Sequence, residues 1–288
     1  MPRATPDELP ALTRLLDETW RGLAVKQARA HTLGADWWAH TTPFVDRADG
    51  EIVAHVGVLS IPMVQQGRRV EVAGIHAVCC APRFRRQGRI RALLAEALSF
   101  AERAHPTQVL LTDQPAVYES AGFRVVPQHR FELELDDTAP RGLRRLDPED
   151  PLDLACLHGL LARRAPTSKR LGVVEPGWLF IIDEVLATGD LTRLYRDTAG
   201  EVIVAAEPSE EGLLVYDIVF AGTPPPLREL LGGIASGAAS AWLHFAPDRF
   251  DVHAQAVPWA PPDALMVRGS LAAELEREPF ALSPLAYC

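Results

Sequence analysis

Hydrophobic and polar positions in the first half of the chain switch between a helical and a strand period. Apolar residues spaced three and one apart from Ile90 to Ala101 form one face of a helix. Runs bounded by Gly and Pro indicate strands before and after it. In chain order the pattern predicts helices at about 6–20 and within 25–40, a strand pair at 44–56, a strand at 70–81, the helix at 90–101, a strand at 109–112, a short helix at 116–121 and a strand at 130–135.

The second half of the chain repeats this order. Three pairs of segments correspond: TPDE (5–8) with DPED (147–150), FVDRADGEIVAHV (44–56) with LYRDTAGEVIVAA (194–206), and VAGIHAVCCAP (72–82) with VYDIVFAGTPP (215–225). In each helix start an N-cap residue precedes a proline, and in each hairpin a turn precedes Gly-Glu. We therefore predict two copies of one α/β (α+β) unit, domains 1–137 and 145–288, with DDTAPRGLR as the linker.

Length and composition suit a soluble protein of two domains. The chain has 288 residues and is 48% hydrophobic, which suits two domains of roughly 140 residues each. Its start has no apolar signal segment, and no run of about 18 uncharged apolar residues occurs, which predicts a cytoplasmic protein without membrane contact. The formal net charge of −9 argues against nucleic-acid binding. The cysteines show neither a disulfide framework nor metal-ligand spacing, so we expect no metal.

The loop before the 90–101 helix has the composition of a phosphate site. RFRRQGRIR (83–91) places five arginines in nine positions around Gly88. A glycine between a strand and a helix lets backbone N–H groups approach a phosphate, and the helix N-terminus favours negative charge. The alternative is a solvated helix start with an ordinary turn. The loop has neither a dinucleotide fingerprint nor a P-loop sequence, and a DNA-recognition helix fits poorly with the acidic net charge.

Two segments resemble motifs of one enzyme family. AVCCAPRFRRQGRIRALL is similar to the acetyl-CoA-binding segment of the GNAT superfamily of N-acetyltransferases, whose pattern Arg/Gln-x-x-Gly-x-Gly/Ala reads here from Arg85 to Ile90. Ile90 departs from the pattern. VYESAGF (117–123) resembles the family's Tyr-x-x-x-Gly-Phe segment. The resemblance covers about residues 3–136 and is closest to the Eis-type enzymes, which carry two GNAT units and a sterol-carrier-like domain for which this chain is too short.

The resemblance implies a fold, a co-substrate and a set of site residues. It implies two tandem GNAT-like units, each a mixed, mostly antiparallel sheet flanked by helices, with acetyl-CoA bound to the first. Tyr118 then takes the place of the general acid, because a phenol stays protonated at neutral pH. A purely structural role for Tyr118 is the alternative. The implied acetyl-CoA contacts are Val78, Cys79 and Cys80 for the pantetheine and Arg85, Arg86, Gln87, Gly88, Arg89, Ile90 and Arg91 for the pyrophosphate.

The strand before the loop holds one candidate for the base. Alternation predicts that Gly74, His76, Val78 and Cys80 share a face, on which His76 is the titratable group. Asp113, after the next strand, is the reserve. A satisfied core histidine is the alternative.

The acceptor side is expected to be aromatic. Trp37 and Trp38, with Phe44, lie in the region that lines the acceptor pocket in the family, and Asp113 is a further candidate substrate contact. Asp36 could bind an amine or cap a helix. Packing in the core is the alternative for the aromatic residues.

These observations predict an N-acetyltransferase that acts on the amine of a small molecule or peptide, with a non-catalytic acyl-CoA-binding or regulatory protein as the alternative. In the second copy, Pro224, Pro225 and Pro226 replace the arginine-glycine loop, and proline has no N–H to offer a phosphate. We therefore expect the second unit to bind no acetyl-CoA and to serve as a packing partner or to support a homodimer.

Overall fold

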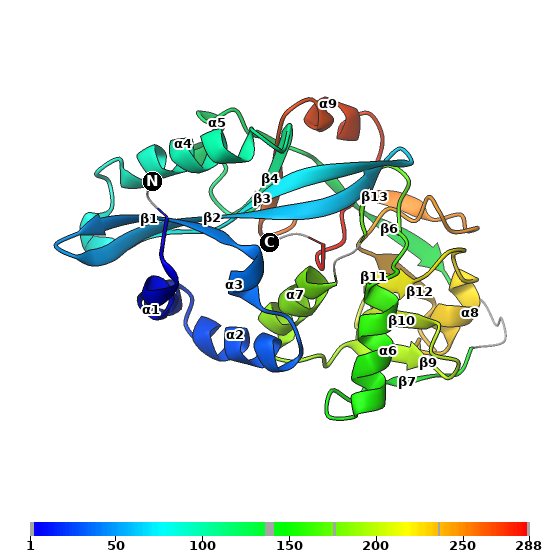
Figure 1. The fold of residues 1–288 in the computed structure, drawn as a ribbon. Helices are drawn as coiled ribbons and strands as arrows, with labels where there is room; N and C mark the ends of the chain where they lie inside the picture. The colour runs from blue at the N-terminus through cyan, green and yellow to red at the C-terminus, as the bar shows by residue number, and fades with distance from the viewer. Residues whose placement is uncertain (1–2, 136–140, 175–176, 236, 287–288) are drawn as a thin grey trace.

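The computed structural model describes residues 3–135, 141–174, 177–235 and 237–286. Within these residues the strands form two mixed sheets of seven strands each, flanked by helices (Figure 1). The predicted fold class is confirmed. No helix in these ranges is long and apolar enough to cross a membrane.

The first sheet has the order β1-β2-β3-β4-β14-β5, with the short strand β8 beside β2. Helices α1 and α2 pack on one face and α4 on the other, which gives the sheet two separate apolar layers (Figure 1). Its strands and helices are β1 (Thr42–Ala48), β2 (Glu51–Gln65), β3 (Arg68–Cys80), β4 (Thr107–Thr112), β5 (Arg124–Val125), β8 (Gly172–Val173), β14 (Ala264–Arg268), η1 (Pro6–Glu8), α1 (Leu9–Thr19), α2 (Leu23–Thr32), α3 (Trp37–His40), η2 (Pro82–Phe84), α4 (Arg89–Ala101) and α5 (Ala116–Glu119).

The second sheet has the order β13-β6-β12-β11-β10-β9-β7. Among the described strands, β11 and β12 form the one parallel pair of this sheet, and β3 and β4 form the one parallel pair of the first sheet. The two sheets therefore share one arrangement of strands. Its elements are β6 (Gln128–Glu134), β7 (Leu143–Arg145), β9 (Leu194–Asp197), β10 (Val202–Ser209), β11 (Gly212–Phe220), β12 (Ser240–Leu243), β13 (Gln255–Trp259), α6 (Pro151–Leu161), α7 (Trp178–Thr188) and α8 (Leu227–Gly232). Helix α9 (Leu271–Leu275) follows β14 and packs against it beside the first sheet.

The two halves of the chain exchange strands: the second half gives β8 and β14 to the first sheet, and the first half gives β6 to the second. The strand predicted at 130–135 forms as β6, but it pairs with β12 and β13 of the second sheet. In return, β14 from the second half pairs with β4 and β5 of the first. The sheets therefore do not divide at the expected linker, of which residues 136–140 lie outside the described ranges. The division into domains 1–137 and 145–288 stays a prediction.

The two sheets also share one hydrophobic core. Leu59 and Ile61 of β2 belong to the same buried cluster as Val204 of β10. Helix α7 lies in this shared region, and every residue from Trp178 to Val185 is buried. A mostly apolar helix that is buried along this length is covered on all sides, so α7 joins the two units.

In the second sheet, the chain's own C-terminal segment packs where β11, β12 and β6 end. Phe280 accepts a hydrogen bond from the backbone of His129, and Ala281 accepts one from Ala246. The Ser283 hydroxyl donates to Asp217 of β11 at 2.7 Å. In the parallel pair of the second sheet, Leu213 pairs with Ala241, as Val72 pairs with Thr107 in the first. Asp217 follows Leu213 by four residues, as His76 follows Val72, so Asp217 occupies the position in the second sheet that His76 has in the first.

Candidate functional site

Strands β3 and β4 separate partway along their length. Their parallel pairing runs from Val72 with Thr107 to Gly74 with Val109, whereas β3 continues to Cys80 and β4 to Thr112. The carboxyl ends of the two strands therefore open a wedge in the sheet. In open α/β sheets, ligands bind outside such carboxyl ends.

A β-bulge in β3 helps to create this wedge. Gly57 pairs with His76 but His55 pairs with Cys79, so β3 has an extra residue relative to β2. Ala77 in the bulge has a φ of 49°, in the left-handed region. The buried His55 side chain holds this conformation, because its Nδ1 lies 2.7 Å from the Ala77 carbonyl oxygen, to which it donates a hydrogen bond.

The bulge corrects the predicted faces of β3. A bulge shifts the alternation by one position, so residues beyond Ala77 change sides. Cys79 packs in the α1 layer, on the side where His76 meets Trp37, whereas Val78 and Cys80 pack in the α4 layer. The expectation that His76, Val78 and Cys80 share one face was therefore wrong.

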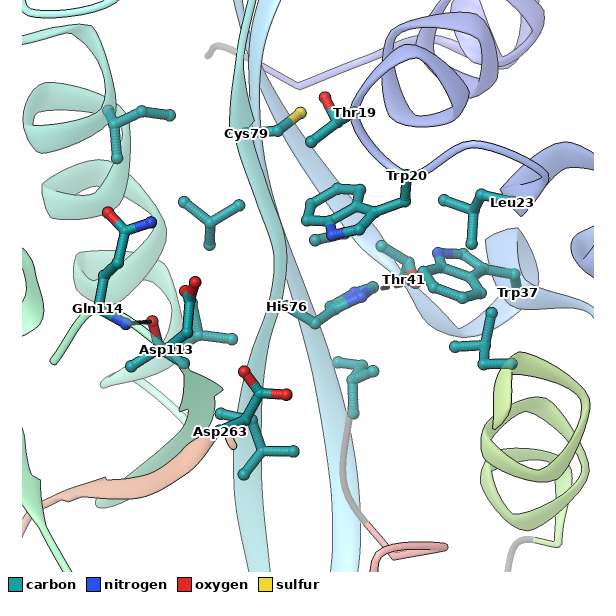
Figure 2. Close-up of a pocket in the computed structure, with 18 of the residues that line it drawn as sticks. Thr19, Trp20, Leu23, Trp37, Thr41, His76, Cys79, Asp113, Gln114 and Asp263 are labelled. Atoms are coloured by element: carbon teal, nitrogen blue, oxygen red, sulfur yellow. Dashed lines mark hydrogen bonds between the residues drawn. The ribbon is translucent and has the colours of Figure 1, made fainter. Parts of the chain in front are cut away.

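A cavity of about 940 Å³ occupies the wedge (Figure 2). Its walls come from both halves of the chain, because α7 and the residue before β14 contribute to it. The predicted site residues that line it are Trp37, His76, Val78, Cys79, Cys80, Arg85, Arg86, Ile90, Asp113 and Tyr118. The predicted residues that do not line it are Trp38, Gln87, Gly88, Arg89 and Arg91.

The N-terminus of α4 stands at the mouth of this cavity. Gly88 precedes the helix with a φ of 75°, and no side chain caps the helix there. The first amides of an α-helix have no partner within the helix, so this turn offers free donors to an anion.

The five arginines of the loop have different roles. Arg83 pairs with Glu51, and Arg89 pairs with Asp46 at 2.6 Å, so both are engaged on the surface of the first sheet. Arg85 lines the cavity while its Nε donates to the Cys80 carbonyl at 3.0 Å. Arg86 is exposed and also lines the cavity. Of the arginines in this loop, Arg85 and Arg86 are therefore the two that line the cavity.

Tyr118 lies in the cavity wall with the chemistry of a weak acid. It is 8% exposed and packs edge-on against Phe123 with ring centroids 6.2 Å apart. Burial, with a smaller contribution from the Asp113 carboxylate, raises the pKa of Tyr118 to about 12. The phenol is therefore protonated throughout the neutral and moderately alkaline range.

His76 does not have the properties of a base near neutral pH. It is 5% exposed, and its Nε2 lies 3.2 Å from the Thr41 hydroxyl. Its ring covers Gly57, where an added Cβ would come within 2.3 Å of Nε2. Burial, and to a lesser extent His55, lowers the pKa of His76 to about 3. The ring stays neutral and forms part of the wall, and its burial argues against the predicted role as a base.

Of the aromatic residues expected at the acceptor side, the structure brings only Trp37 to the cavity wall. Trp38 packs edge-on to His55 at 6.3 Å between ring centroids. Phe44 is buried against Phe100 in the α4 layer. The Asp36 carboxylate accepts hydrogen bonds from two backbone amides of α3 and so caps that helix.

Several cavity residues escaped the sequence analysis. Among them are Trp20 and Leu23 beside the α1–α2 turn, Trp178, Leu179, Ile182, Asp183 and Leu186 of α7, and Asp263 before β14. Nothing in the local pattern of α7 or β14 connects them with the loop at 83–91. His55 was also missed, because a bulge at an alanine has no sequence signature.

Replacing His55 tests whether the bulge matters for catalysis. His55→Phe keeps a ring in the core but removes the donor to Ala77, so the left-handed residue loses its hydrogen bond. We expect kcat to fall about tenfold, because a hydrogen bond is worth about 1 kcal/mol and misplacement of a site costs rate. His244→Phe is the control, since His244 is also buried with a pKa lowered to about 4 but does not line the cavity. Equal kcat values for the two variants would contradict this role.

The comparisons with known proteins agree with this geometry. Residues 2–126 match the family model described as an acetyltransferase (GNAT) domain. This part of the chain is therefore a GNAT acetyltransferase domain. The match supports an acetyl-CoA-dependent acyltransferase activity for this domain. No curated protein matches the chain in sequence.

Three solved structures resemble the whole fold. A probable N-acyltransferase from Enterococcus faecalis V583 is 15% identical, with 94% of this chain and 72% of that chain covered and a TM-score of 0.62. A GCN5-related N-acetyltransferase from Kribbella flavida is 19% identical over 92% of this chain and 69% of its own, with a TM-score of 0.57. Eis1 from Mycobacterium abscessus is 17% identical over 81% and 64%, with a TM-score of 0.53. At these identities the likeness shows a shared fold.

Within the described residues, no group of three or more His, Cys, Asp or Glu side chains is placed to bind a metal ion.

Proposed function

We propose that this chain transfers the acetyl group of acetyl-CoA to the amine of a small molecule or peptide inside the β3–β4 cavity. The observation that carries the proposal is the coincidence, in one cavity, of a separated strand pair, a helix N-terminus with two arginines, and a protonated phenol. Each part meets one requirement of acetyl transfer from a thioester.

The binding step uses the mouth of the cavity. Arg85, Arg86 and the first amides of α4 would hold the pyrophosphate through charge-assisted hydrogen bonds. The pantetheine arm would follow Val78, Cys79 and Cys80, where β3 has left its ladder with β4. The thioester would then lie deeper in the cavity than the phosphates, on the side of Tyr118.

The chemical step would be direct attack by the amine. The nitrogen lone pair attacks the thioester carbon, the C–S bond breaks, and the departing thiolate takes the proton of the Tyr118 phenol. The amine nitrogen loses its extra proton to water or to the exposed Asp113, and solvent then restores the phenol proton. An acyl-cysteine route is disfavoured, because burial raises the pKa of Cys79 to about 12 and also raises the pKa of Cys80, which keeps both as thiols.

Titration with acetyl-CoA tests the binding part of the proposal. Arg85→Ala combined with Arg86→Ala should weaken acetyl-CoA binding at least tenfold in calorimetry, since two charge-assisted contacts are lost. Arg83→Ala is the matched control, because Arg83 belongs to the same loop but pairs with Glu51 outside the cavity.

The same titration gives the number of sites. We expect one acetyl-CoA per chain, because prolines precede the six-residue helix α8 and the segment from Phe280 to Ser283 packs at the corresponding strand ends of the second sheet. An unchanged affinity in the double variant, or a stoichiometry of two, would refute this binding mode.

A further inference from the structure

We infer that the acceptor is a primary amine attached to an apolar body, aromatic or branched, with no carboxylate of its own. The inference rests on the proposed function and names the acceptor class of the same cavity. It follows from the contrast between the cavity mouth, which has Arg85 and Arg86, and the apolar wall opposite it.

The wall opposite the acetyl-CoA mouth is made of large apolar side chains. It is formed by the α1–α2 turn, α3 and α7, three segments that the fold brings together from both halves of the chain. We call it the acceptor wall, and its apolar members are Trp20, Leu23, Trp37, Trp178, Leu179, Ile182 and Leu186.

Trp20 is the most solvent-exposed of the apolar residues in the acceptor wall. It is 43% exposed although it lines the cavity, whereas Leu23 is 7% exposed. Figure 2 shows the rings of Trp20 and Trp37 facing the same space above His76, with Leu23 beside them. A flat apolar body in this space would remove the Trp20 ring from water, which favours binding in proportion to the apolar area covered.

One carboxylate lies within the acceptor wall. Asp183 of α7 is 8% exposed and lines the cavity among Leu179, Ile182 and Leu186. The other residues named for the acceptor wall are apolar, so a second ammonium group on the acceptor would have to leave water for an apolar surface.

The rim of the cavity carries two further carboxylates. Asp113 follows β4 and Asp263 precedes β14, and since Thr112 pairs with Ala264 the two aspartates are neighbours across the strands (Figure 2). An acceptor with its own carboxylate would meet this pair. Arg21 and Lys26 also line the cavity, but the Lys26 ammonium is bound to the Leu186 carbonyl at 2.6 Å. The two neighbouring aspartates at the rim, rather than the net charge of the whole lining, therefore disfavour amino acids.

Three amines test the apolar body, the number of ammonium groups and the carboxylate one at a time. The amine 2-phenylethylamine has an aromatic body and one charge, putrescine has two charges and no bulky body, and phenylalanine adds a carboxylate to the aromatic body. With saturating acetyl-CoA and detection of the released thiol, we expect kcat/KM for 2-phenylethylamine to exceed that of the other two at least tenfold. Trp20→Ala should lower that kcat/KM about tenfold and leave the Kd for acetyl-CoA unchanged.

Trp242→Ala is the matched control, since Trp242 is a half-buried tryptophan of β12 that does not line the cavity. A preference for putrescine or phenylalanine, or equal losses in the two tryptophan variants, would overturn the acceptor class while leaving acetyl transfer intact. Failure of every amine in a broad panel to release thiol from an enzyme that binds acetyl-CoA would instead overturn the proposed function, and this inference with it.

Discussion

Replacing Tyr118 with phenylalanine is expected to lower kcat about 100-fold while leaving the Kd for acetyl-CoA unchanged. The phenylalanine ring keeps the edge-on packing against Phe123 and removes only the proton that the departing thiolate would take. A positioned general acid contributes roughly 10²–10⁴-fold to rate. Because burial raises the pKa of Tyr118 to about 12, ionisation of the phenol should not reduce the wild-type rate between about pH 6 and 10.

A second tyrosine provides a close control for this variant. Burial and a hydrogen bond to Glu207 raise the pKa of Tyr216 to about 12 as well, but Tyr216 lies on β11 of the second sheet and does not line the cavity. Tyr216→Phe should therefore retain kcat within about twofold. Full activity of Tyr118→Phe across this pH range would show that the phenol is not the general acid. Water would then protonate the departing thiolate.

Replacing Asp217 with asparagine is expected to lower the free energy of unfolding by about 3–5 kcal/mol, because it leaves the Arg164 guanidinium buried without its counter-charge. Arg164 donates to both carboxylate oxygens of Asp217 at 3.0 Å, and the two side chains are 2% and 0% exposed. Asp217 also accepts the hydroxyl of Ser283, so the change would loosen the C-terminal segment. Urea-induced unfolding, followed by fluorescence, measures the loss.

The double change Arg164→Met with Asp217→Leu distinguishes the buried charge from the shape of the site. Removing both partners avoids an uncompensated charge, so most of the stability should return. Unfolding should also occur in one transition, since each sheet contains a strand from the other half of the chain. A loss below about 1 kcal/mol in Asp217→Asn, or a double variant as unstable as the single one, would contradict the assigned role of this ion pair.

The elements that the sequence predicted well depend on local pattern. The 90–101 apolar face forms α4 at Arg89–Ala101, and Gly88 has the positive φ that a glycine before a helix allows. The short helix with Tyr118 forms at Ala116–Glu119. The plan of two similar units is also present in the two sheets, because the repeat preserves the order of helices and strands.

The strand pairings and the base could not be predicted in this way. Alternation shows that 130–135 is a strand but carries no information on its partner, and the pairing with β12 and β13 depends on the distant second half. Alternation also assigned the faces of β3 wrongly beyond Ala77, because one left-handed alanine shifts the period. His76 looked titratable from its type, but its burial, which only packing sets, lowers its pKa to about 3.

By itself, the sequence determined the order of elements, the arginine-glycine loop and the position of Tyr118, since these depend on neighbouring residues and on local backbone conformation. The tertiary structure alone decided which arginines face the cavity, which histidine stays neutral, and that α7 and β14 complete the first unit. These properties depend on burial, on charge pairing and on contacts between residues more than 100 positions apart, such as Lys26 with Leu186. The acceptor wall is of this second kind, because Trp20 and Asp183 meet in one cavity only after the two halves share a core.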